Sequence, residues 1–169
     1  MNMFKSTLIA AALVATGFAG TASAATANTN FQVRINITES CAFSTTGASD
    51  VDFGDKARSS AGNADTTGTL VVNCTQGTPF NIGLNAGTYV GATVSTRRMS
   101  NGSNSIPYNL YRDSNRSQNW GNTISNDTQA GTGTGANQNI TVYGRVAGGA
   151  AVNVPAGVYT DTIQATITY

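Results

Sequence analysis

Polar and apolar side chains alternate through the segment from Ala25 to Cys41. Its second half carries four apolar side chains, one at every second position: Phe31, Val33, Ile35 and Ile37. The positions between them are polar. A period of two residues is typical of a β-strand with one buried face. The segment is therefore predicted to be a strand, and its apolar face needs something to cover it.

The same alternation recurs along the rest of the chain, separated by turn-forming residues such as Asn101 and Gly102. It predicts short strands at residues 51–53, 69–75, 80–84, 106–111, 140–146 and 158–169, and a short strand or arm at 89–96. The last strand has one face formed by Tyr159, Ile163, Ala165, Ile167 and Tyr169. Strands at this spacing favour an all-β, immunoglobulin-like Greek-key sandwich without helices. One edge of that sandwich lacks a partner.

Residues 1–24 have one positive charge, Lys5, an apolar middle and a small-residue end, Ala22-Ser23-Ala24. This arrangement predicts a signal peptide cleaved after Ala24. A membrane anchor is disfavoured because the apolar run is shorter than the roughly 20 residues that a spanning helix needs. The rest of the chain is long enough for one domain with one core.

Charge and cysteine content narrow the function further. The chain has 9 Lys and Arg against 8 Asp and Glu, so removal of Lys5 leaves 9 − 1 = 8 of each sign. There is no basic cluster that would bind nucleic acid or anionic lipid. Because Cys41 and Cys74 both lie in the exported part, a single structural disulfide is expected.

Catalytic and metal-binding patterns are missing. The chain has no histidine, which excludes Ser-His-Asp and Cys-His catalysis and His-based zinc sites. Asp50, Asp52 and Asp55 lack the spacing of a calcium-binding loop, and the other carboxylates stand mostly in turns. We expect neither enzymatic activity nor a cofactor. The aromatic residues could line a sugar-binding face, but packing is the simpler interpretation: Tyr108, Tyr111, Trp120, Tyr143 and Tyr159.

Five stretches together resemble one known family. They are VNCTQGTPFNIGLNAGT (71–87), RRMSNGSNSIPYNLYRD (97–113), NWGN (119–122), TVYGRV (141–146) and PAGVYTDTIQATITY (155–169). The resemblance is to the spore-coat-protein-U-like domain, shared by pilin subunits of archaic chaperone–usher (Csu-type) pili. Cys41 and Cys74 stand in the matching motifs.

This resemblance implies an incomplete immunoglobulin-like sandwich, residues 39–169, that receives a donor strand from a neighbouring subunit. The donor extension would be residues 25–38, inserting Phe31, Val33, Ile35 and Ile37. The acceptor groove would be bordered by the strand that contains Tyr159, Ile163, Ala165, Ile167 and Tyr169. The implied partners are identical or related pilins, a periplasmic chaperone and an outer-membrane usher, and the implied location is a pilus on the cell surface.

Three functions follow from the sequence. The leading one is a structural pilin that supports adhesion and biofilm formation. A tip adhesin that binds a receptor or surface, and a secreted spore-coat-like structural protein, are the alternatives.

Overall fold

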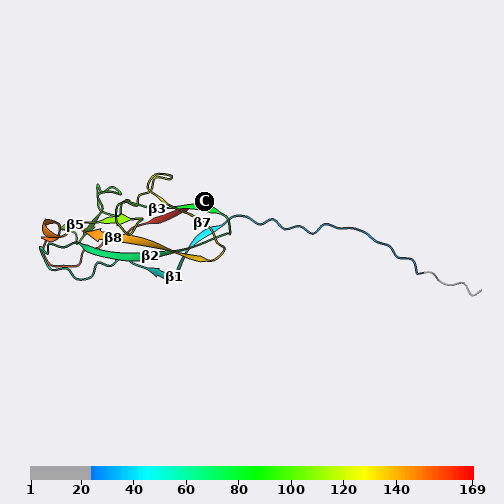
Figure 1. Cartoon of the computed structure of the whole chain (residues 1–169), viewed down its shortest axis with the longest axis horizontal. Helices are drawn as coiled ribbons and strands as arrows, with labels where there is room; N and C mark the ends of the chain where they lie inside the picture. The colour runs from blue at the N-terminus through cyan, green and yellow to red at the C-terminus, as the bar shows by residue number, and fades with distance from the viewer. Residues whose placement is uncertain (1–23) are drawn as a thin grey trace, which may run out of the picture. The chain divides into compact units, whose positions relative to one another are not determined.

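The computed structural model describes residues 24–169 (Figure 1). The predicted signal peptide, apart from Ala24, lies outside the described residues. Residues 37–169 form one compact unit, built from nine strands and a short 3-10 turn, η1 (Gly149–Val152). The all-β prediction is confirmed.

The larger sheet has four strands in the order β1-β2-β8-β6. Its strands are β1 (Cys41–Ser49), β2 (Ala64–Cys74), β8 (Asn137–Val146) and β6 (Asn109–Tyr111). The antiparallel pair β2–β8 is continuous from Ala64↔Val146 to Asn73↔Asn137 and lies at the centre of the unit (Figure 1). Valine and threonine are frequent in these two strands, as is usual for a pleated, half-buried surface.

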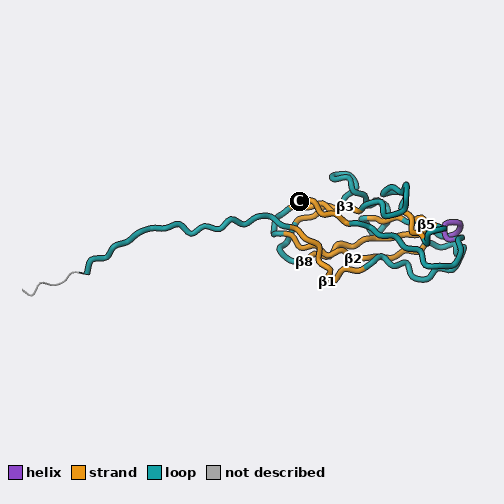
Figure 2. Tube along the Cα trace, turned by 180° about the vertical axis from the view of Figure 1, so that it is seen from behind, coloured by secondary structure: helices purple, strands orange, loops and turns teal. Residues whose placement is uncertain are grey.

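The second sheet has three strands in the order β7-β3-β9. Its strands are β7 (Gln129–Thr132), β3 (Pro79–Leu84) and β9 (Ala165–Thr168). A separate hairpin joins β4 (Arg98–Ser100) to β5 (Ser105–Pro107). Figure 2 shows that much of the remaining chain is loop, coloured teal between the orange strands.

The core fills the space between the two sheets. Inward side chains of the strands are almost fully buried, together with Tyr108 and Trp120 from the connecting segments. The complete set is Val72, Phe80, Ile82, Leu84, Tyr108, Leu110, Trp120, Val142 and Val146. Trp120 donates its indole N–H to the carbonyl oxygen of Ile82, at 2.8 Å. This bond fixes the long connection between β6 and β7 to the centre of the second sheet.

The disulfide expected from the sequence is present. Cys41 and Cys74 are bonded and are directly opposite one another at the end of the β1–β2 ladder. The bond therefore joins the first residue of β1 to the last residue of the central strand β2.

Several strand boundaries differ from the sequence prediction. No strand is assigned in residues 24–40 or at residues 51–53, because no described strand offers them a ladder of hydrogen bonds. The last strand is limited to Ala165–Thr168, which is the stretch where β3 lies alongside it. Strand β7 falls where the sequence predicts a loop, since glycine and threonine give it little apolar alternation.

Candidate functional site

An open groove runs along the compact unit. Its volume is about 1270 Å³. Its two sides are residues 50–56, here called the N-wall, and residues 157–165, the C-wall. Its floor is formed by apolar side chains of both sheets and of the loops that join them, among them Leu70, Leu84, Tyr108, Leu110, Val142 and Val146.

The N-wall follows β1 and pairs with no other described strand, and Gly54 within it has a left-handed backbone conformation. Its residues form no backbone–backbone hydrogen bond within residues 24–169. Side-chain packing holds it instead: Val51 and Phe53 lie over Gly144 of β8, and Val51 also lies over Gly68 of β2. A Cβ at Gly68 would be only 2.9 Å from the carbonyl oxygens of Ser49 and Asp50. Glycine is needed there because the wall passes so close to the sheet.

The C-wall is bonded along one edge only. The backbone of Thr160 exchanges two hydrogen bonds with Ser100, and the carbonyl of Gln164 accepts one from Asn85. In an extended chain the backbone groups of alternate residues point to opposite edges. Those of Tyr159, Asp161 and Ile163 thus point away from Ser100 and Asn85, and none has a backbone partner within the described chain. The free edge of the C-wall therefore faces the groove.

The side chains alternate along the C-wall and onward through β9. Threonine and glutamine occupy the exposed row at positions 160, 162, 164, 166 and 168. The other row is half-buried and consists of Tyr159, Asp161, Ile163, Ala165 and Ile167. Asp161 is the one charged residue in this otherwise apolar row.

Asp161 is held in place by four hydrogen bonds. Its Oδ1 accepts from the backbone N–H of Thr88, from the Thr88 hydroxyl and from the N–H of Thr162, at 2.7–2.8 Å. Its Oδ2 accepts from the Tyr108 hydroxyl at 2.7 Å. Burial alone would raise the pKa of the Asp161 carboxyl, but the hydrogen bonds from Tyr108, Thr88 and Thr162 hold it below its ordinary value. Burial, followed by the bond to Asp161, raises the pKa of Tyr108, so the phenol stays a neutral hydrogen-bond donor.

Tyr108 also reaches the N-wall. Its ring lies edge-on to the ring of Phe53, with centroids 6.4 Å apart. A continuous chain of contacts thus crosses the groove from Phe53 through Tyr108 to Asp161. These contacts set how far apart the two walls lie.

A buried arginine supports the C-wall from behind. Arg97 is fully buried and donates hydrogen bonds to four backbone carbonyls, those of Leu84, Asn85, Val94 and Trp120, at 2.7–3.0 Å. Burial lowers the pKa of this guanidinium. The four bonds fix the end of β3, which in turn pairs with the C-wall.

The structure brings together only some of the predicted groove residues. Tyr159, Ile163 and Ala165 line the groove, whereas Ile167 and Tyr169 do not. Ile167 lies beyond its end, opposite Ile82 of β3, and Tyr169 is largely exposed. The roles of all five residues in binding a donor strand remain predictions.

Sequence reasoning missed Asp161 and the N-wall. A single aspartate in a threonine-rich stretch is indistinguishable from a turn residue. Val51 and Phe53 do alternate in the sequence, but their partners, Gly68 and Gly144, carry no side chain that a hydrophobic pattern could reveal.

The N-terminal segment, residues 25–38, has no described partner. Its four alternating apolar side chains are 83%, 89%, 82% and 72% exposed: Phe31, Val33, Ile35 and Ile37. Regularly spaced apolar side chains with this exposure are typical of interaction sites.

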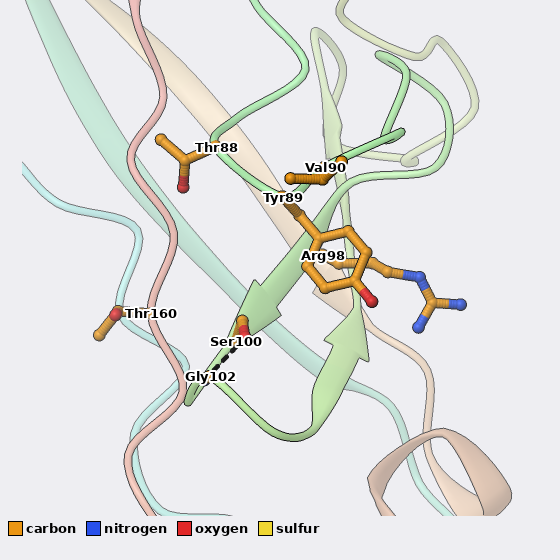
Figure 3. A pocket seen from close by; sticks show the side chains of 7 residues that line it. All are labelled: Thr88, Tyr89, Val90, Arg98, Ser100, Gly102 and Thr160. Carbon is orange, nitrogen blue, oxygen red and sulfur yellow. Dashed lines mark hydrogen bonds between the residues drawn. The ribbon is translucent and has the colours of Figure 1, made fainter.

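A second hollow of about 350 Å³ lies outside the groove, beside the β4–β5 hairpin (Figure 3). The Arg98 guanidinium lies 5.8 Å from the centroid of the Tyr89 ring, and Ser100 accepts a hydrogen bond from the Gly102 N–H. Val90 is almost fully exposed at its rim.

The aromatic residues proposed as a possible sugar-binding face are not together. Tyr108 and Trp120 are buried in the core, while Tyr111 and Tyr143 are opposite one another on β6 and β8. Within residues 24–169, no group of three or more histidine, cysteine or acidic residues is placed to hold a metal ion. In the same range, no helix has the length and apolarity needed to span a membrane.

Comparison with known sequences identifies relatives over the whole chain. A family model described as the Spore Coat Protein U domain matches residues 27–166. Protein U of Myxococcus xanthus is 36% identical over 182 aligned positions, which cover all of both chains. These matches confirm the resemblance seen in the sequence motifs.

Two solved structures share the fold. One is a chain in the pre-assembly complex of the chaperone CsuC with the tip adhesion subunit CsuE, from archaic chaperone–usher Csu pili of Acinetobacter baumannii. Its TM-score is 0.56 at 20% identity, and the match covers 79% of this chain but only 40% of that one. The other is the P pilus rod subunit PapA, with a TM-score of 0.51 at 15% identity, covering 76% of this chain and 98% of PapA. The compact unit thus has a pilin-type, immunoglobulin-like fold.

Proposed function

The chain belongs to the Spore Coat Protein U domain family, and we propose that it is a structural pilin whose subunits polymerise by strand insertion. Residues 25–38 of one copy enter the groove of the next copy and add a strand between the N-wall and the C-wall. The function is structural rather than catalytic, and the resulting fibre supports adhesion and biofilm formation.

The observation that carries this proposal is the open groove. On both of its sides, backbone N–H and C=O groups lack a backbone partner within the described chain, and its floor is apolar. Unpaired strand edges accept a further strand readily. The same chain carries a segment with a strand's alternation and four exposed apolar side chains, which matches what the groove lacks.

The free energy of such a joint is favourable. Burial of each of the four apolar side chains contributes roughly 1.5–3 kcal/mol, and each new backbone hydrogen bond adds about 0.5–1.5 kcal/mol. The loss of rotational and translational freedom opposes these terms. Because each copy has one donor and one groove at different places, the contact is head to tail and generates a filament rather than a closed dimer.

An empty groove is also an aggregation hazard. We therefore infer that a periplasmic chaperone covers the groove after export and that an outer-membrane usher exchanges it for the next subunit. The described fold resembles a chain of a chaperone–subunit complex, which supports the chaperone as a partner. Nucleic acid is not a partner in this scheme.

Charge substitution in the inserted row tests the proposal. Val33→Asp and Ile35→Asp each place a carboxylate that would have to enter a dry groove, so neither variant is expected to form fibres. Gln32→Asp introduces the same charge on the opposite row and serves as the matched control, which should polymerise. Fibres are measured by negative-stain electron microscopy and by heat-resistant oligomers on denaturing gels. Equal fibre formation by all three variants would contradict strand insertion.

A second candidate is a secreted coat subunit outside any pilus. It is favoured by the full-length relationship to Protein U of Myxococcus xanthus. Both candidates use the same joint, so localisation separates them: immunogold labelling along thin fibres supports a pilin, whereas a continuous layer around the cell supports a coat. Label only at fibre ends would instead indicate a tip adhesin.

A further inference from the structure

The groove contains one fixed anionic group. Asp161 belongs to the inward row of the C-wall, between Tyr159 and Ile163. Its carboxylate is bonded to Thr88 in the loop after β3 and to Tyr108 in the floor. Gly87 packs directly against it, and a Cβ at that position would collide with the carboxylate. The group is therefore built into the wall rather than free to turn out to solvent.

The two oxygens of this carboxylate are used unequally. Oδ1 accepts three hydrogen bonds, from Thr88 twice and from Thr162. Oδ2 accepts one, from Tyr108. A carboxylate oxygen accepts two hydrogen bonds readily, so Oδ2 can take a further donor from a strand that enters the groove. An aliphatic side chain placed there would instead cover a charged group without a bond to it.

The N-terminal segment offers one suitable donor. The row that contains Phe31 and Ile37 consists, from its start, of Ala25, Ala27, Thr29 and then the four apolar residues. The Thr29 hydroxyl is the single hydrogen-bond donor among the side chains of this row between residues 25 and 37. It stands immediately before the apolar residues. In a strand antiparallel to the groove-lining residues 154–165, Thr29 opposite Asp161 places residues 31–35 opposite residues 159–155 and keeps every aliphatic side chain away from the carboxylate.

We propose that Asp161 is a specificity-determining residue of the groove, and that its Oδ2 accepts a hydrogen bond from the Thr29 hydroxyl of a second copy. This inference rests on the proposed strand insertion. The bond fixes the register of the inserted strand, because a displacement by two residues would bring Phe31 or Ala27 to the carboxylate. A displacement by one residue would turn the polar row, with Gln32 and Arg34, into the apolar floor.

A binding experiment with a double substitution tests the inference. The acceptor is the whole exported chain, and the probe is a fluorescent synthetic peptide of residues 25–40. Thr29→Val in the peptide removes the hydroxyl while keeping the shape of the side chain. Loss of a hydrogen bond to a charged acceptor should weaken peptide binding to the wild-type chain about tenfold. Thr38→Val, on the opposite row, is the matched control and should change binding less than about twofold.

The same peptides are then measured against two groove variants. Asp161→Asn replaces the charged acceptor with a neutral amide, which can still pair with the Thr29 hydroxyl, so the difference between the wild-type and Thr29→Val peptides should fall from about tenfold to about threefold or less. Tyr108→Phe loosens the wall but keeps the carboxylate, so the difference between the two peptides should persist. Secondary structure measured by circular dichroism confirms that both variants are folded.

The outcomes separate the inference from the proposed function. If the wild-type peptide binds and the tenfold ratio is unchanged in Asp161→Asn, Thr29 does not contact Asp161 and the inference is wrong. A ratio close to one on the wild-type chain overturns it in the same way. If the wild-type peptide does not bind any of the chains, strand insertion itself fails.

Discussion

Arg97 carries a positive charge inside the core with no carboxylate among its hydrogen-bond partners. Four of its five N–H groups donate instead to four carbonyl oxygens from three separate segments, an arrangement that suits the planar fork of a guanidinium and no other side chain. Without it, those carbonyls would be buried and unpaired, at a cost of about 1–3 kcal/mol each. The sequence does not indicate this role, because Arg97 stands beside Arg98 and several polar residues, and an arginine in such surroundings is normally predicted to be exposed to solvent.

Asp161 makes the stability of the fold depend on pH in the acid range. Hydrogen bonds hold its folded-state pKa below the ordinary value of 3.8. A lowered pKa means that the charged form stabilises the fold at any pH above about 4 and that this contribution is lost as the pH falls through the folded pKa. Between neutral and acid pH, the unfolding free energy of the wild type should therefore fall by about 1 kcal/mol more than that of Asp161→Asn. This figure already allows for the partial exposure of Asp161 to solvent.

Urea denaturation at several pH values between about 7 and 2 measures this effect. Asp55→Asn is the control, because Asp55 is exposed and makes no hydrogen bond within the described part of the chain. The pKa of Asp65 is also lowered, chiefly by its hydrogen bond to Arg145. The stability of the Asp161→Asn variant will therefore still vary with pH, though less than that of the wild type. Parallel curves for wild type and Asp161→Asn would contradict the assignment.

At the scale of the elements, the N-wall depends on two glycines that lie beneath it. Gly68→Ala places a Cβ against the backbone oxygens of Ser49 and Asp50, which cannot move without shifting the wall. We expect a loss of about 1–3 kcal/mol in unfolding free energy and weaker binding of the peptide of residues 25–40. Chemical denaturation and fluorescence anisotropy measure the two effects.

Gly62→Ala is the matched control for Gly68→Ala. A Cβ on Gly62 meets no atom within 4 Å, so the substitution should leave both stability and peptide binding unchanged within about 0.5 kcal/mol. If the two alanine variants behave alike, the wall is not seated on Gly68 as described.

Sequence patterns predicted the strands that are covered on one face. The alternation in residues 69–75, 80–84 and 140–146 corresponds to the observed strands β2, β3 and β8, and the disulfide between β1 and β2 was expected from export alone. Patterns failed where backbone pairing decides the outcome. Strand β7 has almost no alternation of apolar and polar side chains. Residues 31–37 alternate clearly, but no strand lies beside them in the described chain.

The candidate site was predicted only in part for the same reason. Tyr159, Ile163 and Ala165 were recognisable because one side of a strand alternates with the other. The hydrogen bond between Tyr108 and Asp161 joins residues 53 positions apart, and the opposite wall rests on glycines of β2 and β8 that are distant in the sequence. No local pattern records such a contact.

At the scale of the whole molecule, the balance of charge predicts how assembly responds to salt. Without the predicted signal peptide the chain has as many basic as acidic residues, and the apolar row of residues 31–37 is uncharged. Electrostatic steering between copies should therefore be weak. Raising sodium chloride from about 0.05 to about 0.5 M should change the rate of polymerisation less than about threefold.

Light scattering of the purified exported chain, followed over time at each salt concentration, measures that rate. Gln32→Asp provides the comparison, since an added charge on the exposed row should make the rate more sensitive to salt. A change of more than about tenfold in the wild-type chain would mean that charge, rather than apolar burial, controls the encounter between copies.

The disulfide has a mechanical consequence for a filament of such subunits. Tension carried by an inserted N-terminal segment enters its own subunit through the backbone at Cys41. The bond to Cys74 passes that force directly to β2, the strand that pairs with β8 from Ala64 to Asn73. The force therefore does not have to travel through the hydrogen bonds between β1 and β2, which could otherwise be peeled apart one at a time. Under reducing conditions the weakest point of the fibre should move from the joint between subunits to the first strand within each of them.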